Sequence, residues 1–228
     1  MTELTLAALF LVGSHMGLSH GAIRRGLVGK LGLWPHRLVY SLISIVAMAW
    51  LVLAYKDAPF QVVFEATIRL QHMALSMMLA ATLLIVGGYT IANPSAVILE
   101  DLESRGPLSG TLKITRAPVM WGVAIFAFAH MLANPDAGSL IFFGALLVLA
   151  IAGGWHLDRR KQAEGGEVWQ KLCAQTSFWP LKAIVLRRTK LSGADLSWWR
   201  LAVGLGLYGG LLFAHKLIIG VTAFPLPL

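Results

Sequence analysis

Charged residues are scarce in this chain of 228 residues. Asp, Glu, Lys and Arg together make up 13% of it, whereas 57% is hydrophobic. Soluble domains carry about 25% charged residues, because their surface has to face water. The mean hydropathy of +0.71 points the same way. The composition excludes an ordinary soluble domain and indicates a membrane protein.

Cysteine is nearly absent, since Cys173 is the only one in the chain. A single thiol cannot form an intramolecular disulfide, a thiolate zinc site or an iron–sulfur cluster. We expect Cys173 to be an inert structural thiol.

Long apolar runs are what the chain has instead. A helix needs about 20 residues to cross the ~30 Å hydrocarbon core of a bilayer. Windows of that length predict six spans, at residues 4–21, 38–55, 67–92, 117–134, 138–156 and 200–222. The first run is too polar in its second half for a signal peptide, so it is kept as a mature helix. We therefore predict one all-α domain over residues 1–228, a multi-pass transmembrane helix bundle.

Basic residues gather in alternate linkers between the predicted spans. Sixteen of the nineteen Lys and Arg lie after spans one, three and five or at the start of span six, and only Lys56 and Arg69 lie in the opposite linkers. The positive-inside rule then places these basic linkers in the cytoplasm and both termini on the outer, periplasmic side of a bacterial inner membrane. The net charge of +8 is a topology signal and does not indicate nucleic-acid binding.

Two of the basic linkers have features of a membrane interface. Residues 96–105 fit either a short amphipathic helix or a plain connector. Residues 157–199 mix tryptophan with Lys and Arg, which is typical of a segment at the level of the lipid headgroups.

Four of the seven histidines fall well inside predicted spans: His15, His72, His130 and His215. His20, His36 and His156 lie near span ends, and we assign them to the interface. A single membrane histidine most often makes an interhelical hydrogen bond. Four of them in a chain with one cysteine favour a haem held between helices, because neutral imidazole is a usual axial ligand of haem iron.

The spacing of three glycines and the depth of the histidines in the membrane both bear on a haem site between helices. Gly13, Gly17 and Gly21 repeat every four residues, which suits either close helix packing or the wall of a flat ligand. At 1.5 Å per residue, His15 lies about 16 Å and His130 about 6 Å below the outer boundary, a difference that helix tilt would have to reduce. His72 and His215 are alternative ligands or supporting partners.

Several motifs resemble one family over nearly the whole chain. They are residues 10–15 (FLVGSH), 24–32 (RRGLVGKLG), 116–122 (RAPVMWG), 129–134 (AHMLAN), 143–144 (FG), 158–160 (DRR) and 176–180 (TSFWP). With these motifs the chain resembles the NnrU family of bacterial membrane proteins, whose relative in plants and cyanobacteria is the 15-cis-zeta-carotene isomerase.

The resemblance implies a b-type haem with His15 and His130 as axial ligands. Arg24, Arg25 and Arg116 are then expected at the cytoplasmic surface, where a guanidinium can pair with a haem propionate. The chain departs from the family twice. A further histidine of the isomerase branch has no counterpart near residues 54–57, and Ala117 stands where the family usually carries histidine.

Three functions follow as alternatives. The first is a haem protein connected with nitrite and nitric oxide metabolism (denitrification), in which the iron meets a diatomic gas. The second is an enzyme, a haem-dependent isomerase of a polyene. The third is a non-catalytic membrane scaffold or assembly factor, in which the histidines only bridge helices.

Overall fold

The structure is a computed structural model that describes residues 1–225 except 92–109, 165 and 196. Within these residues every regular element is helical, apart from one isolated bridge between Val62 and Asp136. The all-α prediction is confirmed. The predicted interfacial segment at 96–105 lies outside the described residues.

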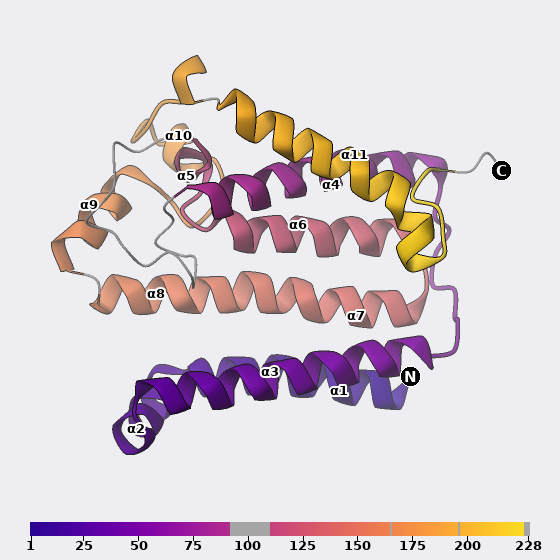
Figure 1. The fold of residues 1–228 in the computed structure, drawn as a ribbon, viewed down its shortest axis with the longest axis horizontal. Coiled ribbons are helices and arrows are strands. Elements are labelled where there is room, and N and C mark those ends of the chain that lie inside the picture. The colour runs from indigo at the N-terminus through magenta and orange to yellow at the C-terminus, as the bar shows by residue number, and fades with distance from the viewer. Residues whose placement is uncertain (92–109, 165, 196, 226–228) are drawn as a thin grey trace.

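The N-terminal helices form one side of the bundle. Helix α1 (Thr2–Ser19) ends at His20, where the chain bends by 68° into α2 (Gly21–Leu31), and α3 (Leu33–Lys56) returns along α1 (Figure 1). Ala7 and Ala47 are fully buried where α1 meets α3, beside Leu11 and Leu51. Small side chains let the two backbones approach, and leucines fill the space on either side.

The opposite side is built from α4 (Ile68–Thr90), α6 (Pro118–Ala133) and α11 (Trp198–Ile219), with the short α5 (Thr111–Ile114) before α6. Helices α4 and α6 pack closely because glycines face each other's helix. A Cβ on Gly122 would lie 2.5 Å from Ile85 Cγ1, and one on Gly88 would lie 2.6 Å from Val119 Cγ2. By contrast, a Cβ on Gly13 or Gly17 would meet no described atom within 4 Å, so no described helix packs on that face of α1.

One long helix lies between these two sides. Helix α7 (Ala137–Val148) passes through a π-helical turn, η1 (Leu149–Gly153), into α8 (Gly154–Glu164) (Figure 1). It is followed by α9 (Gly166–Gln175), α10 (Lys182–Val185) and a 3-10 turn, η2 (Gly193–Asp195). The predicted linker 157–199 is therefore largely helical, and the membrane helix extends beyond its predicted end at residue 156.

The six predicted spans correspond to six apolar helices, but the number of spans is confirmed only in part. Helices α3, α4, α7–α8 and α11 are long and apolar enough to cross a membrane, and α1 with α2 makes a fifth candidate despite its bend. Helix α6 has only 16 residues. Pro118 at its first turn and Asn134-Pro135 after its end limit its length, which a hydropathy window does not register.

Candidate functional site

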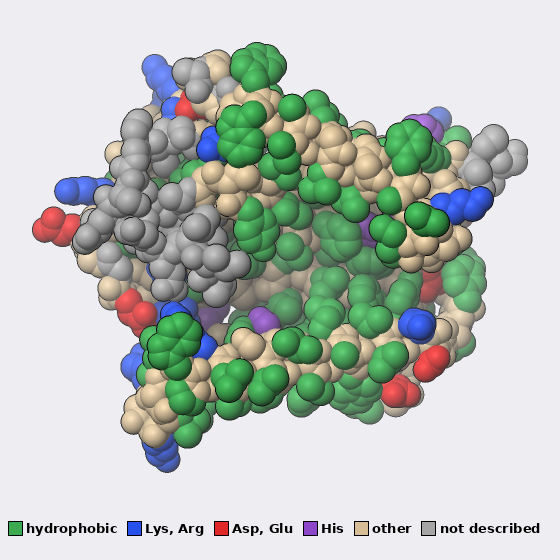
Figure 2. Space-filling model, in the orientation of Figure 1, with side chains coloured by type: hydrophobic (Ala, Val, Ile, Leu, Met, Phe, Trp, Pro, Cys, Tyr) green, Lys and Arg blue, Asp and Glu red, His purple; other side chains and the backbone are tan. Residues whose placement is uncertain are grey.

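A cavity of about 550 Å³ opens between α3 and the α6–α8 part of the bundle. Figure 2 shows this region as a hollow with apolar walls in which histidine side chains are visible. Its walls include Met48 of α3, Val123 of α6 and Leu146 of α7, and the π-helical turn forms part of its lining. Cavities of this size and character bind small molecules and cofactors, and π-helical turns are frequent at functional sites.

His15 lines this cavity. Its Nδ1 lies 3.1 Å from Ser44 Oγ, and the same hydroxyl lies 2.8 Å from the Tyr40 carbonyl, to which it can donate. In the tautomer with the proton on Nδ1, His15 donates to Ser44 Oγ and the Nε2 lone pair is available, as in metal-ligating histidines.

His36 lines the same cavity and is buried there, whereas a solvated side chain near a span end was expected from the sequence. Helix α3 begins at Leu33, five residues before the predicted span, so His36 is only 7% exposed. Its ring is stacked with that of Tyr40, with 6.4 Å between the ring centroids. Its buried Nε2 has no hydrogen-bond partner among the described residues. A buried polar atom in this state normally has a ligand, an ion or water.

Positive side chains surround one end of the cavity: Arg24, Arg37, Arg160 and Lys161. His156 also lines it and donates from Nε2 to the Ser19 carbonyl at 3.0 Å, while its ring stacks on His20. Arg25 does not line the cavity. The site thus combines apolar walls, imidazoles and a cationic end, which suits a flat apolar ligand carrying acidic groups.

The other predicted histidines lie elsewhere. His130 donates from Nδ1 to the Phe126 carbonyl at 2.9 Å and stacks on Phe143, outside the cavity lining. At 1.5 Å per residue, His15 lies about 20 Å along α1, whereas His130 lies about 5 Å from the end of α6 nearest the N-terminus. The structure does not bring these two imidazoles into one cavity, and their pairing stays a prediction.

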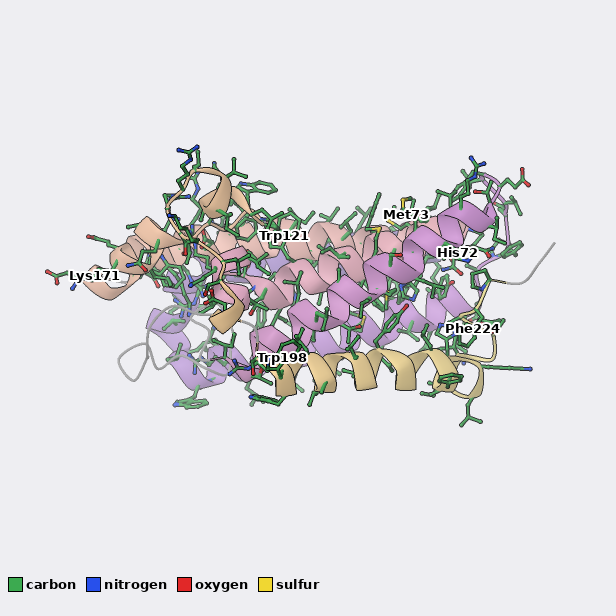
Figure 3. All side chains as sticks on the ribbon, turned by 90° about the horizontal axis from the view of Figure 1, so that it is seen from above. His72, Met73, Trp121, Lys171, Trp198 and Phe224 are labelled. Carbon is green, nitrogen blue, oxygen red and sulfur yellow. The ribbon has the colours of Figure 1, made fainter. Side chains whose placement is uncertain are left out.

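His72 and His215 lie at that same end of the bundle. His72 is exposed and donates to the Ile68 carbonyl, and Figure 3 shows it far from Lys171 and near the end that carries Phe224. His215 donates to the Val221 carbonyl at 2.7 Å. His72, His130 and His215 lie away from the cavity that His15 and His36 line.

Arg116 lies in a different buried cluster, joined to Asp158 by two hydrogen bonds of 2.5 and 2.7 Å. Its guanidinium also donates to the Thr176 carbonyl, and its backbone N–H donates to Ser177. The motifs at 116–122, 158–160 and 176–180, which are far apart in the sequence, thus meet at one point. The sequence contained these motifs but no sign that they would pair.

Aromatic side chains extend this cluster. Trp121 Nε1 and Thr115 Oγ1 both donate to the Phe178 carbonyl, and the rings of Trp155 and Trp179 lie within 6 Å of Phe178. Ala117 stands where histidine was expected from the family pattern. It is buried next to Arg116 and occupies the N-cap position of α6. Arg116 is consequently part of a structural junction and does not line the histidine cavity.

Among the described residues, no three His, Cys, Asp or Glu side chains gather closely enough to hold a metal ion together. Haem needs fewer ligands from the protein than a bare metal ion does, since one or two axial side chains are sufficient. The cavity fits haem on its own chemistry: an available His15 Nε2, the unpartnered His36 Nε2 and cations for propionates.

Comparison with known proteins decides the family. The profile described as "NnrU protein" matches residues 3–223 of the chain. The chain belongs to the NnrU family. This NnrU-family chain is also 34% identical over 83 residues to the chloroplastic 15-cis-zeta-carotene isomerase of Zea mays, a match that covers 36% of the chain and 23% of the isomerase. No solved structure matches it.

The Arg116–Asp158 junction gives a first prediction. Asp158→Asn removes the charge of the carboxylate that pairs with the buried Arg116 guanidinium and should lower the free energy of unfolding by about 3–5 kcal/mol. Glu164→Gln is the control, because Glu164 is 54% exposed and its pair with Arg160 spans 4.0 Å. It should cost less than about 1 kcal/mol. Denaturation in mixed micelles measures both, and equal stability of the two variants would contradict the structural role of the pair.

Proposed function

We propose that this NnrU-family protein binds a b-type haem in the cavity between α3 and α6–α8, with His15 as one axial ligand. The observation that carries the proposal is that His15 lines an apolar cavity together with a second, buried imidazole, His36, and several cationic side chains. The hydrogen bond to Ser44 engages His15 Nδ1, so that Nε2 is the nitrogen that would bind the iron.

Two residues compete for the second axial position. His36 is favoured by the cavity, because it lines the same space as His15 and its Nε2 has no partner among the described residues. His130 is favoured by the family resemblance, and binding there would require α1 and α6 to shift relative to each other. The two candidates lead to different spectra in variants.

The haem propionates would face the cationic end of the cavity. Arg24 lines this end with Arg37 and Arg160, and a guanidinium pairs well with a carboxylate. Arg25 and Arg116 were also expected to make such contacts. Arg116 is committed to Asp158, so Arg24 is the strongest candidate of the three.

The visible spectrum of purified protein from haem-replete cells tests this proposal. Wild-type protein should show a Soret band and sharpened bands after reduction with dithionite. His15→Ala should lose or shift these bands, and so should whichever of His36→Ala and His130→Ala removes the second ligand. Exposed His72→Ala is the matched control and should leave the spectrum unchanged. An unaltered spectrum in His15→Ala would rule out the assigned ligand.

We also propose that the chain lies in the bacterial inner membrane with both termini outside. Helices α2, α9 and α10 lie at the end of the bundle opposite the N-terminus (Figure 1). Lys171 and Trp198 lie toward this end in Figure 3, away from His72 and Phe224. One end therefore carries the basic segments, which supports a cytoplasmic position for it.

Reporter fusions test the orientation. Alkaline phosphatase, which is active only outside the cytoplasm, should be active when fused after Phe224 and inactive when fused after Gln175. A fluorescent protein that matures in the cytoplasm should give the opposite pattern. High phosphatase activity at Gln175 would reverse the proposed topology.

A polyene isomerase is the second candidate function. The hollow with apolar walls in Figure 2 would admit an extended apolar substrate, and the Zea mays relative carries the name of a carotene isomerase. When bound, haem would supply an iron that exchanges electrons or ligands, whereas the chain holds the substrate against apolar walls and excludes water. A diatomic gas is the other substrate class, in keeping with a role in denitrification.

Co-expression with a cis-carotenoid pathway distinguishes these possibilities. A polyene isomerase should change the ratio of product isomers, and the His15→Ala variant should abolish the change. A protein that binds a diatomic gas should leave the carotenoid isomers unaltered. The spectrum of its reduced form should shift when nitric oxide is added. A scaffold should do neither and should purify without haem.

A further inference from the structure

A second cavity, of about 460 Å³, lies beside the Arg116–Asp158 junction. It is formed by α8, α9 and the segment around α10, at the end of the bundle that carries the basic linkers. It shares no lining residue with the histidine cavity. Any ligand there would be independent of the proposed haem.

Among the described residues that line this second cavity, Arg116, Lys182 and Arg188 are cationic and none is Asp or Glu. Arg116 pairs with Asp158, which also accepts a hydrogen bond of 3.1 Å from the Gln162 amide. The exposed Lys182 and Arg188 add positive charge to the lining, which favours an anion.

The segment that presents these two cations is held in an unusual conformation. Leu181 and Arg187 have φ of 62° and 56°, and they are the non-glycine residues with positive φ in the described chain. Both flank α10, and they directly precede Lys182 and Arg188. Arg188 is further fixed by a hydrogen bond of 3.3 Å to the Cys173 carbonyl. Strained backbone of this kind concentrates at ligand sites.

Trp169 adds an unused donor. Its side chain lines the cavity and is only 1% exposed, yet Nε1–H has no hydrogen-bond partner among the residues that the structure describes. An indole can only donate, so the group that satisfies it must be an acceptor. Trp155 and Trp179 also line this cavity. Tryptophan side chains are typical of a pocket at the level of the lipid headgroups.

We propose that this second cavity binds a phosphate group, with Lys182 and Arg188 supplying charge and Trp169 Nε1–H a hydrogen bond. Phosphate oxygens accept hydrogen bonds, which matches the donors of Lys182, Arg188 and Trp169 in the lining. The phosphate belongs either to the headgroup of an anionic phospholipid or to a soluble phosphate ester. Binding gives the Trp169 indole the acceptor that it lacks among the described residues.

Cys173 provides the measurement, because it lines the cavity and is the chain's only cysteine. Burial raises the pKa of its thiol, so alkylation is followed at alkaline pH, where the rate is measurable. The full chain is placed in nanodiscs of phosphatidylcholine with or without phosphatidylglycerol. A parallel series titrates inorganic phosphate against chloride at equal ionic strength.

Occupancy should slow alkylation several-fold. Slowing by phosphatidylglycerol alone identifies a lipid headgroup, and slowing by inorganic phosphate identifies a soluble phosphate; both support the site. Lys182→Gln with Arg188→Gln should abolish the protection, and Trp169→Phe, which keeps a ring but loses the donor, should weaken it. Lys171→Gln is the control, since Lys171 lies on α9 but does not line the cavity.

Two results would overturn the proposal. One is an alkylation rate that neither phosphatidylglycerol nor phosphate changes in wild-type protein. The other is protection that persists in the double variant. If the double variant does not remain monodisperse, the single variants at the exposed Lys182 and Arg188 give the same comparison.

Discussion

The buried pair of Arg116 and Asp158 is the constraint on which this end of the molecule depends. Two charges in a medium of low dielectric are tolerated only when each is satisfied, and here two parallel hydrogen bonds do so. The pair fixes the start of α6 against α8, and a further bond to Thr176 draws the loop after α9 onto both helices. Residues of α6 and α8 also line the histidine cavity, and Arg116 itself lines the second cavity, so both cavities adjoin the elements that this pair connects.

The inner polar groups of the bundle follow a related rule. Each of the four histidines predicted inside spans has one ring nitrogen in a hydrogen bond, with Ser44 for His15 and with backbone carbonyls for His72, His130 and His215. Hydrogen bonding alone therefore does not separate a ligand from a structural histidine. What separates His15 is its position in a cavity with a second buried imidazole and a cationic end. That combination is the basis for proposing haem as the ligand.

The sequence predicted the helical class, the approximate helix positions and the location of His15 inside a helix, because apolar runs and isolated polar groups within them are local features. It did not indicate that His36 is buried, since a hydropathy window centred on the apolar run of α3 omits a polar first turn that is nevertheless helical. It did not anticipate the break at His20 or the extension of α7 through a π-helical turn into α8, because both depend on packing. The meeting of Arg116 with Asp158 and Thr176 involves residues 42 and 60 positions apart, and no local pattern contains it.

Haem is the proposed ligand of the cavity that contains His15. The most direct test is the haem content of full-length protein purified from haem-replete cells, measured as the pyridine haemochrome and compared with protein concentration. A b-type haemochrome in stoichiometric amount is expected. Folded, monodisperse protein that carries no haem and takes none up on titration would contradict the proposed haem site.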